Sequence, residues 1–181
     1  REHGFEDLPG LLAPADAPKL ALAVLVENGR SGSGTGWGTR QLGERYPTAQ
    51  IVALDIAMGM LQASRGTSSW WNKLFAGNAR HYVCADMEAL PIKANSIDMV
   101  WSNLAVQWCN DLPATLVELQ RVMKVDGLLM FSTFGPDTLK ELRQSFAQVD
   151  TFSHVNRFID MHDIGDLLVR NGFSTPVMDM E

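Results

Sequence analysis

A glycine-rich turn over residues 32–36, with the sequence GSGTG, constrains the fold of this chain more than any other feature. An apolar run over 20–26 precedes the turn, and a stretch typical of a helix follows it over 37–45. A second apolar run over 51–54 then ends on Asp55, close to the roughly 20 residues after the glycines at which a ribose-binding acid is expected. This order of strand, turn, helix, strand and acid predicts a βαβ unit whose backbone approaches a nucleotide-like cofactor.

The spacing of the glycines indicates which cofactor binds. A dinucleotide site favours G-x-G-x-x-G, but the third glycine of that pattern would fall on Trp37 or on Thr39. The pattern G-x-G-x-G does fit, and it is typical of S-adenosylmethionine (SAM) sites. A flexible loop without a ligand is the alternative. The SAM interpretation assigns four residues of the turn to cofactor binding: Gly32, Ser33, Gly34 and Gly36.

Apolar runs and helix-like stretches alternate along the rest of the chain. Further strands are expected at 82–84, 97–101 and 127–133, with a candidate sixth strand at 173–178. Helices are expected at 58–65, 113–123, 138–146 and 162–171, the last ending at Gly172. Such alternation predicts an α/β fold with a Rossmann-like, doubly wound, mostly parallel sheet that binds ligands at the carboxyl ends of its strands.

Composition excludes several other classes of protein. The net charge is −6, so there is no general basic field for nucleic acid. The longest apolar run is far shorter than the roughly 20 residues that span a bilayer, and no signal peptide is recognisable. Cys84 and Cys109 are expected to be buried thiols in a reducing compartment. We therefore expect a cytoplasmic protein without a metal site, a membrane partner or a nucleic-acid partner.

Asp55 ends the second predicted strand and is the candidate ligand for the cofactor ribose. Capping of the next helix is the alternative role, and the two roles are compatible. Ile56 and Met60 would then offer apolar contacts to the adenine ring, although core packing explains them nearly as well.

Asp86 follows the third predicted strand and is the candidate acceptor for the adenine amino group. Met87 would pack on the ring, and Glu88 is expected to face solvent. A capped turn before Pro91 is the alternative.

The segment 102–108, with the sequence SNLAVQW, follows the fourth predicted strand, where a transferred group would meet its acceptor. Asn103, Gln107 and Trp108 are therefore candidates for positioning a substrate, and Asn103 is also a candidate cofactor ligand. In the alternative, Leu104 and Trp108 belong only to the core, and Gln107 only caps a helix.

These features resemble the class I SAM-dependent methyltransferases. Three strings make the resemblance more particular, because they are similar to those of the malonyl-acyl-carrier-protein O-methyltransferases of biotin synthesis: SNLAVQW at 102–108, FGPDTLKEL at 134–142 and HVNRF at 154–158. The resemblance runs from about residue 20 to the end. It implies a transferase that uses SAM to convert the free carboxylate of a malonyl thioester, carried by acyl carrier protein or coenzyme A, into a methyl ester in biotin biosynthesis.

The implied chemistry asks little of the side chains. A carboxylate is ionised at pH 7, so we assign no catalytic base, and alignment of the reacting atoms matters most. Arg157, in a string that the resemblance singles out, is the candidate cation for the carboxylate or its carrier, with a structural ion pair as the alternative. Lys140 and Arg143 could face an acidic carrier protein, but a solvated helix face explains them better. A monomer is expected.

Two features depart from the family pattern. Arg30 stands two residues before the first glycine, where an acid is usual, and an arginine pointing at the cofactor would repel its sulfonium. The last strands of the sheet are also expected to lie beyond Glu181, so residues 20–181 are assigned to a C-terminally incomplete methyltransferase domain. Residues 1–19 show no clear periodicity and are assigned to an N-terminal arm. Alternatives are another small-acid carboxyl methyltransferase, an arginine hydroxylase of the complex I assembly-factor type, and a non-catalytic SAM-binding module.

Overall fold

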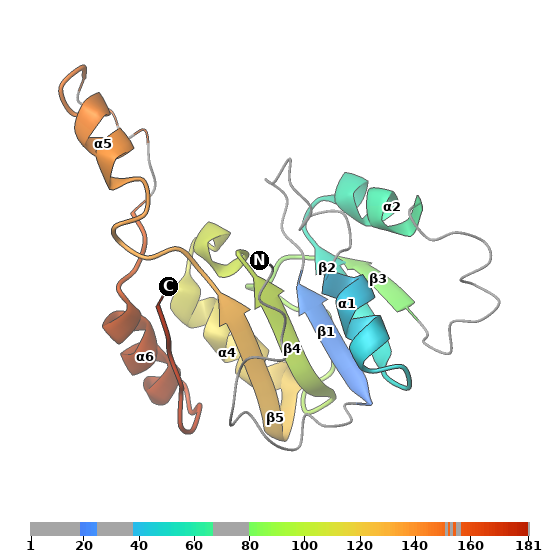
Figure 1. The fold of residues 1–181 in the computed structure, drawn as a ribbon. Helices are drawn as coiled ribbons and strands as arrows, with labels where there is room; N and C mark the ends of the chain where they lie inside the picture. The colour runs from blue at the N-terminus through green and yellow to red at the C-terminus, as the bar shows by residue number, and fades with distance from the viewer. Residues whose placement is uncertain are drawn as a thin grey trace.

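A parallel β-sheet forms the centre of the computed structural model, which describes residues 19–24, 38–66, 80–150, 152, 154 and 157–180. Its strands are β1 (Leu20–Val24), β2 (Gln50–Asp55), β3 (Arg80–Cys84), β4 (Ile97–Asn103) and β5 (Met123–Ser132). They lie side by side in the order β3-β2-β1-β4-β5, and every neighbouring pair is parallel (Figure 1). The order reverses beside β1, which is where ligands bind in open sheets of this kind.

Helices cover both faces of the sheet. The helical elements are α1 (Gly38–Arg45), α2 (Met58–Gly66), the 3-10 turn η3 (Val106–Trp108), α4 (Leu112–Val122), α5 (Lys140–Phe146) and α6 (Met161–Arg170). Helices α1 and α2 pack on one face, and α4 packs on the other (Figure 1). Helix α6 packs against α4 and η3. The predicted doubly wound α/β fold is confirmed.

Strand β2 shows why the sheet needs a layer on each face. Its residues alternate in direction, so Ile51 joins the cluster that contains Leu42 of α1, while Leu54 joins the cluster that contains Leu119 of α4. Both sides of the strand are therefore apolar, which is why its sequence reads as a continuous apolar run. Each large side chain buried in this way contributes about 1.5–3 kcal/mol to folding.

The two helices on the α4 side begin and end at residues that the sequence marks. Asp111 caps α4 by accepting a hydrogen bond from the Ala114 amide at 2.9 Å, and Asp160 caps α6 by accepting one from the His162 amide at 2.9 Å. Helix α6 stops before Gly172, whose φ of 83° is a left-handed conformation that glycine adopts readily. The predicted end of this helix is confirmed.

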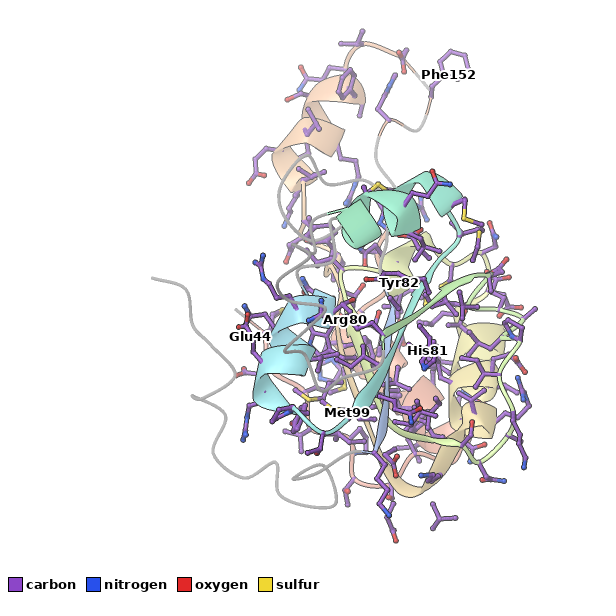
Figure 2. The ribbon with its side chains drawn as sticks, turned by 90° about the vertical axis from the view of Figure 1, so that its right-hand side faces the viewer. Glu44, Arg80, His81, Tyr82, Met99 and Phe152 are labelled. Atoms are coloured by element: carbon purple, nitrogen blue, oxygen red, sulfur yellow. The ribbon has the colours of Figure 1, made fainter. Side chains whose placement is uncertain are left out.

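Two predictions made from the sequence are wrong in detail. The candidate strand at 173–178 forms no strand, because the apolar side chains Phe173 and Met178 pack against the α4–α6 cluster instead of entering the sheet. The helix expected over 138–146 begins at Lys140, since Leu139 has a left-handed backbone with φ of 57°. None of the residues of α5 is buried, and the helix stands out from the sheet (Figure 1). Phe152, 78% exposed, lies at the far end of this projection (Figure 2).

Helix α1 lies unusually close to β4 at Gly38. A Cβ atom on Gly38 would overlap the ring of Trp101, a side chain that is itself buried in the sheet. Glycine at this position therefore lets the first turn of α1 rest directly on the indole ring. The contact fixes where α1 starts.

Gly38→Ala is expected to lower the free energy of unfolding by about 1–3 kcal/mol, because the new methyl group forces the Trp101 ring or the helix to move. Gly59→Ala, in α2, is the matched control: no atom lies within 4 Å of the added Cβ, so this change should be neutral or stabilise by about 0.5–1 kcal/mol. Denaturant unfolding of both variants measures the difference. Equal stabilities would show that the contact with Trp101 imposes no constraint.

Asp98 connects three strands at the amino-terminal edge of the sheet. Its carboxylate, at the start of β4, accepts hydrogen bonds from the Leu20 amide at 2.8 Å and from Lys124 Nζ at 2.7 Å. Burial alone would raise the pKa of Asp98, but these hydrogen bonds and the charge of Lys124 more than offset it and hold the pKa below its ordinary value. Asp98 thus ties β1 and β5 to β4.

Asp98→Asn is expected to reduce the free energy of unfolding at pH 7 by about 1 kcal/mol, since the amide loses the charged interaction with Lys124. Because the folded pKa of Asp98 is lowered, this stabilisation exists above the unfolded pKa and is lost as the pH falls through the folded pKa. The difference between wild type and variant should therefore shrink as the pH falls below the ordinary pKa of an aspartate, about 3.9. Asp137→Asn, which removes the exposed Lys140–Asp137 pair on α5, should change little at either pH.

Candidate functional site

The carboxyl ends of four strands bring most of the predicted site residues to one edge of the sheet. Val24, the last residue of β1, lies opposite Leu54 of β2 on one side and Ser102 of β4 on the other. Asp55 and Asn103 are the next residues of those two strands, so they flank the end of β1. The turn residues Gly32, Ser33, Gly34 and Gly36, together with Arg30, lie outside the described residues.

Asp55 is completely buried at the end of β2. Its Oδ1 accepts a hydrogen bond from the Ala57 amide at 2.8 Å, and the Ala57 carbonyl accepts bonds from the amides of Met60 and Leu61 in the first turn of α2. The carboxylate therefore stabilises the start of the helix, as the alternative interpretation expected. The ribose role stays a prediction.

The apolar candidates near Asp55 differ in exposure. Ile56 is 68% exposed and Met60 is half-buried, so both offer surface beside the carboxylate. Met87 is only 8% exposed and packs in the core with Leu54. Its contact with an adenine ring stays a prediction, and core packing is the role that its surroundings support.

The two thiols differ from the expectation that both are buried. Cys84 is exposed, because it ends the edge strand β3, and its thiol donates to the Ile56 carbonyl at 3.4 Å. Cys109 is half-buried, and burial raises the pKa of its thiol.

The loop after β3 is held by its two acids. Oδ1 of Asp86 accepts a hydrogen bond from the Glu88 amide at 2.9 Å, which is the capped turn expected as the alternative to adenine binding. The prediction that Glu88 faces solvent is wrong. It is half-buried, and its Oε1 accepts hydrogen bonds from the amides of Asn110 and Asp111 at 2.5 and 3.1 Å. This contact joins the loop after β3 to the segment after η3, and nothing local in the sequence marks it.

Helix α4 supports the same loop through Glu118 and Arg121. Oε2 of Glu118 accepts a hydrogen bond from the Leu90 amide at 2.8 Å, while Arg121 donates to the carbonyls of Leu90 and Ile92, both at 2.9 Å. The hydrogen bond from Arg121 lowers the pKa of Glu118, so the pair stays charged. The loop is therefore fixed at both ends.

A strained corner joins β4 to η3. Leu104 has φ of 51°, a conformation that costs a residue other than glycine about 1–3 kcal/mol. Its amide donates to both the carbonyl and the hydroxyl of Ser132, each at 3.1 Å, and its carbonyl accepts a hydrogen bond from Gln107 Nε2 at 2.8 Å. Non-glycine backbone strain of this kind clusters at ligand sites.

Two candidates for positioning a substrate, Gln107 and Trp108, lie in η3, directly after this corner. Trp108 is 46% exposed, so it is not simply a core residue. Oε1 of Gln107 is buried and has no hydrogen-bond partner among the described residues. A buried acceptor without a partner is costly, and such atoms often receive a hydrogen bond from a ligand or an ordered water.

The three candidate cations are in different situations. Lys140 pairs with Asp137 at 2.9 Å, and Arg143 donates to the carbonyls of Pro136 and Thr138, so both serve the local structure of α5. Arg157 is exposed and forms no ion pair with any described residue. It is followed by Phe158, which packs edge-on against Phe134 with ring centroids 5.3 Å apart. Arg157 is therefore the one of these three cations whose charged group has no local partner among the described residues, so it can bind a ligand.

Other kinds of site were sought over the same part of the chain. No three His, Cys, Asp or Glu side chains of the described residues gather as a metal site requires. No helix within those residues is long and apolar enough to cross a membrane.

Fold and site together define a Rossmann-like α/β protein with acids and amides along the carboxyl edge of its sheet. Residues 30–131 match the model of the methyltransferase domain family, and the chain belongs to this family.

Curated relatives are similar over most of the chain. The malonyl-[acyl-carrier protein] O-methyltransferase of Gallionella capsiferriformans is 72% identical over 163 residues, which cover 90% of this chain and 55% of that protein. The protein of the same name from Methylovorus sp. is 53% identical over 171 residues, covering 94% and 57%. The chain thus spans about half the length of the curated relatives it matches.

Solved structures share the fold at low sequence identity. An arsenic(III) S-adenosylmethionine methyltransferase from Chlamydomonas reinhardtii has a TM-score of 0.66 at 17% identity, covering 90% of this chain and 55% of that one. An S-adenosylmethionine-dependent methyltransferase from Mesorhizobium loti has a TM-score of 0.62 at 18% identity, covering 89% and 76%. The predicted class I methyltransferase architecture is therefore confirmed at the level of the fold.

Proposed function

We propose that this protein is a SAM-dependent O-methyltransferase that esterifies the free carboxylate of a malonyl thioester, carried by acyl carrier protein or coenzyme A, in biotin synthesis. The observation that carries the proposal is the 72% identity over 163 residues to a relative named for this reaction. We assign the methyltransferase domain to residues 20–181, and SAM is its cofactor.

The residues at the carboxyl edge fit SAM. Asp55 would hold the ribose hydroxyls, and the exposed side chain of Ile56 would contact the adenine. Gly32, Ser33, Gly34 and Gly36 are proposed as cofactor ligands from their sequence pattern. Asp86 and Met60 complete this set of proposed contacts. When bound, SAM supplies a methyl group on a positively charged sulfur, and the balanced transfer gives the methyl ester and S-adenosylhomocysteine with no proton to move.

The proposed reaction asks the protein for position and not for proton transfer. The substrate carboxylate is already ionised at pH 7, so no general base is needed. Holding the carboxylate oxygen in line with the methyl group is what accelerates the reaction, and such alignment can contribute about 7–11 kcal/mol. Asn103, Gln107 and Trp108 lie at or just after the end of β4 and are the residues that we propose align it.

Methyl transfer from labelled SAM tests the function directly. The full-length protein should label malonyl carrier protein or malonyl coenzyme A and leave free diacids such as trans-aconitate unlabelled. Labelling of free diacids alone would favour a small-acid methyltransferase. SAM binding without labelling of any acid, or no SAM binding at all, would reject the proposal.

Replacement of Asp55 tests the cofactor site. Asp55→Asn keeps an oxygen to accept the Ala57 amide but loses the charge, so SAM binding should weaken by about 1–3 kcal/mol while the melting temperature changes little. Asp55→Ala should lose both SAM affinity and stability. Calorimetric titration with SAM measures the affinity. Wild-type affinity in both variants would remove Asp55 from the cofactor site.

Replacement of Arg157 tests the substrate cation. Arg157→Ala should raise the KM for malonyl carrier protein about tenfold, the effect of losing one charged hydrogen bond, with SAM affinity unchanged. Lys140→Ala is the matched control, since Lys140 is paired with Asp137, and it should leave KM unchanged. A fall in thermal stability alone would make Arg157 structural.

We propose further that the protein acts in the cytoplasm as a monomer. The described thiols Cys84 and Cys109 are both free, as suits a reducing compartment. Light scattering of the full-length protein and fractionation of the cells that produce it test the two statements, and a stable dimer or a secreted product would contradict them.

A further inference from the structure

The corner between β4 and η3 contains a short hydrogen bond that bears on how Asn103 meets a substrate. The hydroxyl of Ser132, the last residue of β5, donates to Oδ1 of Asn103 at 2.5 Å. Asn103 and Ser132 also face each other in the register of the two strands. The same hydroxyl oxygen accepts the Leu104 amide at 3.1 Å.

This geometry fixes which end of the Asn103 amide is available. The atom of the Asn103 amide that lies beside the Ser132 hydroxyl is the oxygen, Oδ1. The Ser132 hydroxyl has one proton, and Asn103 Oδ1 receives it. Asn103 Nδ2 has no hydrogen-bond partner among the described residues. Asn103 therefore keeps its two amide hydrogens for a ligand.

We propose that Ser132 is a positioning residue for the methyl transfer described above: by holding Oδ1 of Asn103, it makes Asn103 a hydrogen-bond donor to an oxygen of the substrate acyl group. The inference rests on the proposed function, because the oxygen it concerns belongs to the malonyl carboxylate or thioester. A hydrogen-bond donor at this place favours a substrate group that carries lone pairs. The pair Ser132–Asn103 would thus help the site to bind an ionised carboxylate.

Ser132 can be changed without removing the corner itself. The Leu104 amide also donates to the Ser132 carbonyl at 3.1 Å, and Gln107 holds the Leu104 carbonyl. Loss of the hydroxyl therefore leaves the backbone of the corner bonded and frees only the side chain of Asn103. The role of Ser132 can thus be separated from a role in folding.

A double-mutant cycle on the full-length protein tests the proposal, with kcat and KM for malonyl carrier protein and the Kd for S-adenosylhomocysteine as readouts. Ser132→Ala should lower kcat/KM about tenfold, as loss of one positioning hydrogen bond does, with cofactor affinity unchanged. Ser132→Thr, which keeps a hydroxyl, should restore activity. In the Asn103→Ala background, Ser132→Ala should have no further effect, because Ser132 acts through Asn103.

Ser96→Ala is the matched control. Its hydroxyl donates to the Lys93 carbonyl at 2.6 Å just before β4 begins, at the opposite edge of the sheet, so this change should leave turnover unchanged. Wild-type activity in Ser132→Ala, or the same loss from Ser132→Ala in the Asn103→Ala background as in wild type, would overturn the proposal. A weakened Kd for S-adenosylhomocysteine that accounts for the whole loss would overturn it as well.

A measurement without substrate separates this proposal from the proposed function. The side-chain amide signals of Asn103 in a ¹H–¹⁵N NMR spectrum, identified by their disappearance in Asn103→Asp, should move in Ser132→Ala and stay in place in Ser132→Thr. If wild type transfers no methyl group to a malonyl thioester, the proposed function fails. The Ser132–Asn103 bond is then supported by signals that move in Ser132→Ala and rejected by signals that do not.

Discussion

The position of β1 between β2 and β4 is the constraint on which the candidate site depends. Hydrogen bonding on both of its sides sets Val24 opposite Leu54 and Ser102, so the residues that follow, Asp55 and Asn103, come out on either side of its carboxyl end. A shift of one residue in either ladder would turn these side chains to the opposite face of the sheet. At the other end of β1, Asp98 of β4 accepts hydrogen bonds from the Leu20 amide and from Lys124 of β5.

Around this centre, acidic side chains act as links between segments that are distant in the sequence. Glu88 binds two amides at the start of α4, and Glu118 binds the Leu90 amide. The loop with the candidate adenine acceptor and the segment with the candidate substrate residues are thereby held in one arrangement. Such links reduce the entropy that would otherwise be lost when ligands order these loops.

The sequence predicts the architecture well because the deciding interactions are local or periodic. Continuous apolar runs such as 51–54 identify buried parallel strands, and Gly172 ends its helix through a preference of the backbone itself. The predictions fail where long-range contacts decide. The run at 173–178 has the composition of a strand, but Phe173 and Met178 find their partners on α4 and α6. The role of Glu88 depends on amides 22 and 23 residues away, and no local pattern encodes that pairing. The glycine turn lies outside the described residues, so its role stays a prediction.

Helix α5 has a different standing from the rest of the domain, because none of its residues is buried and it projects from the sheet (Figure 1). Helix α5 contributes few buried contacts to the stability of the domain. Segments of this kind open and reclose at low free-energy cost. Opening of α5 leaves the β-sheet folded, since the core clusters lie elsewhere. The fold therefore lets this projecting helix move or open without disturbing the strands that hold the candidate site.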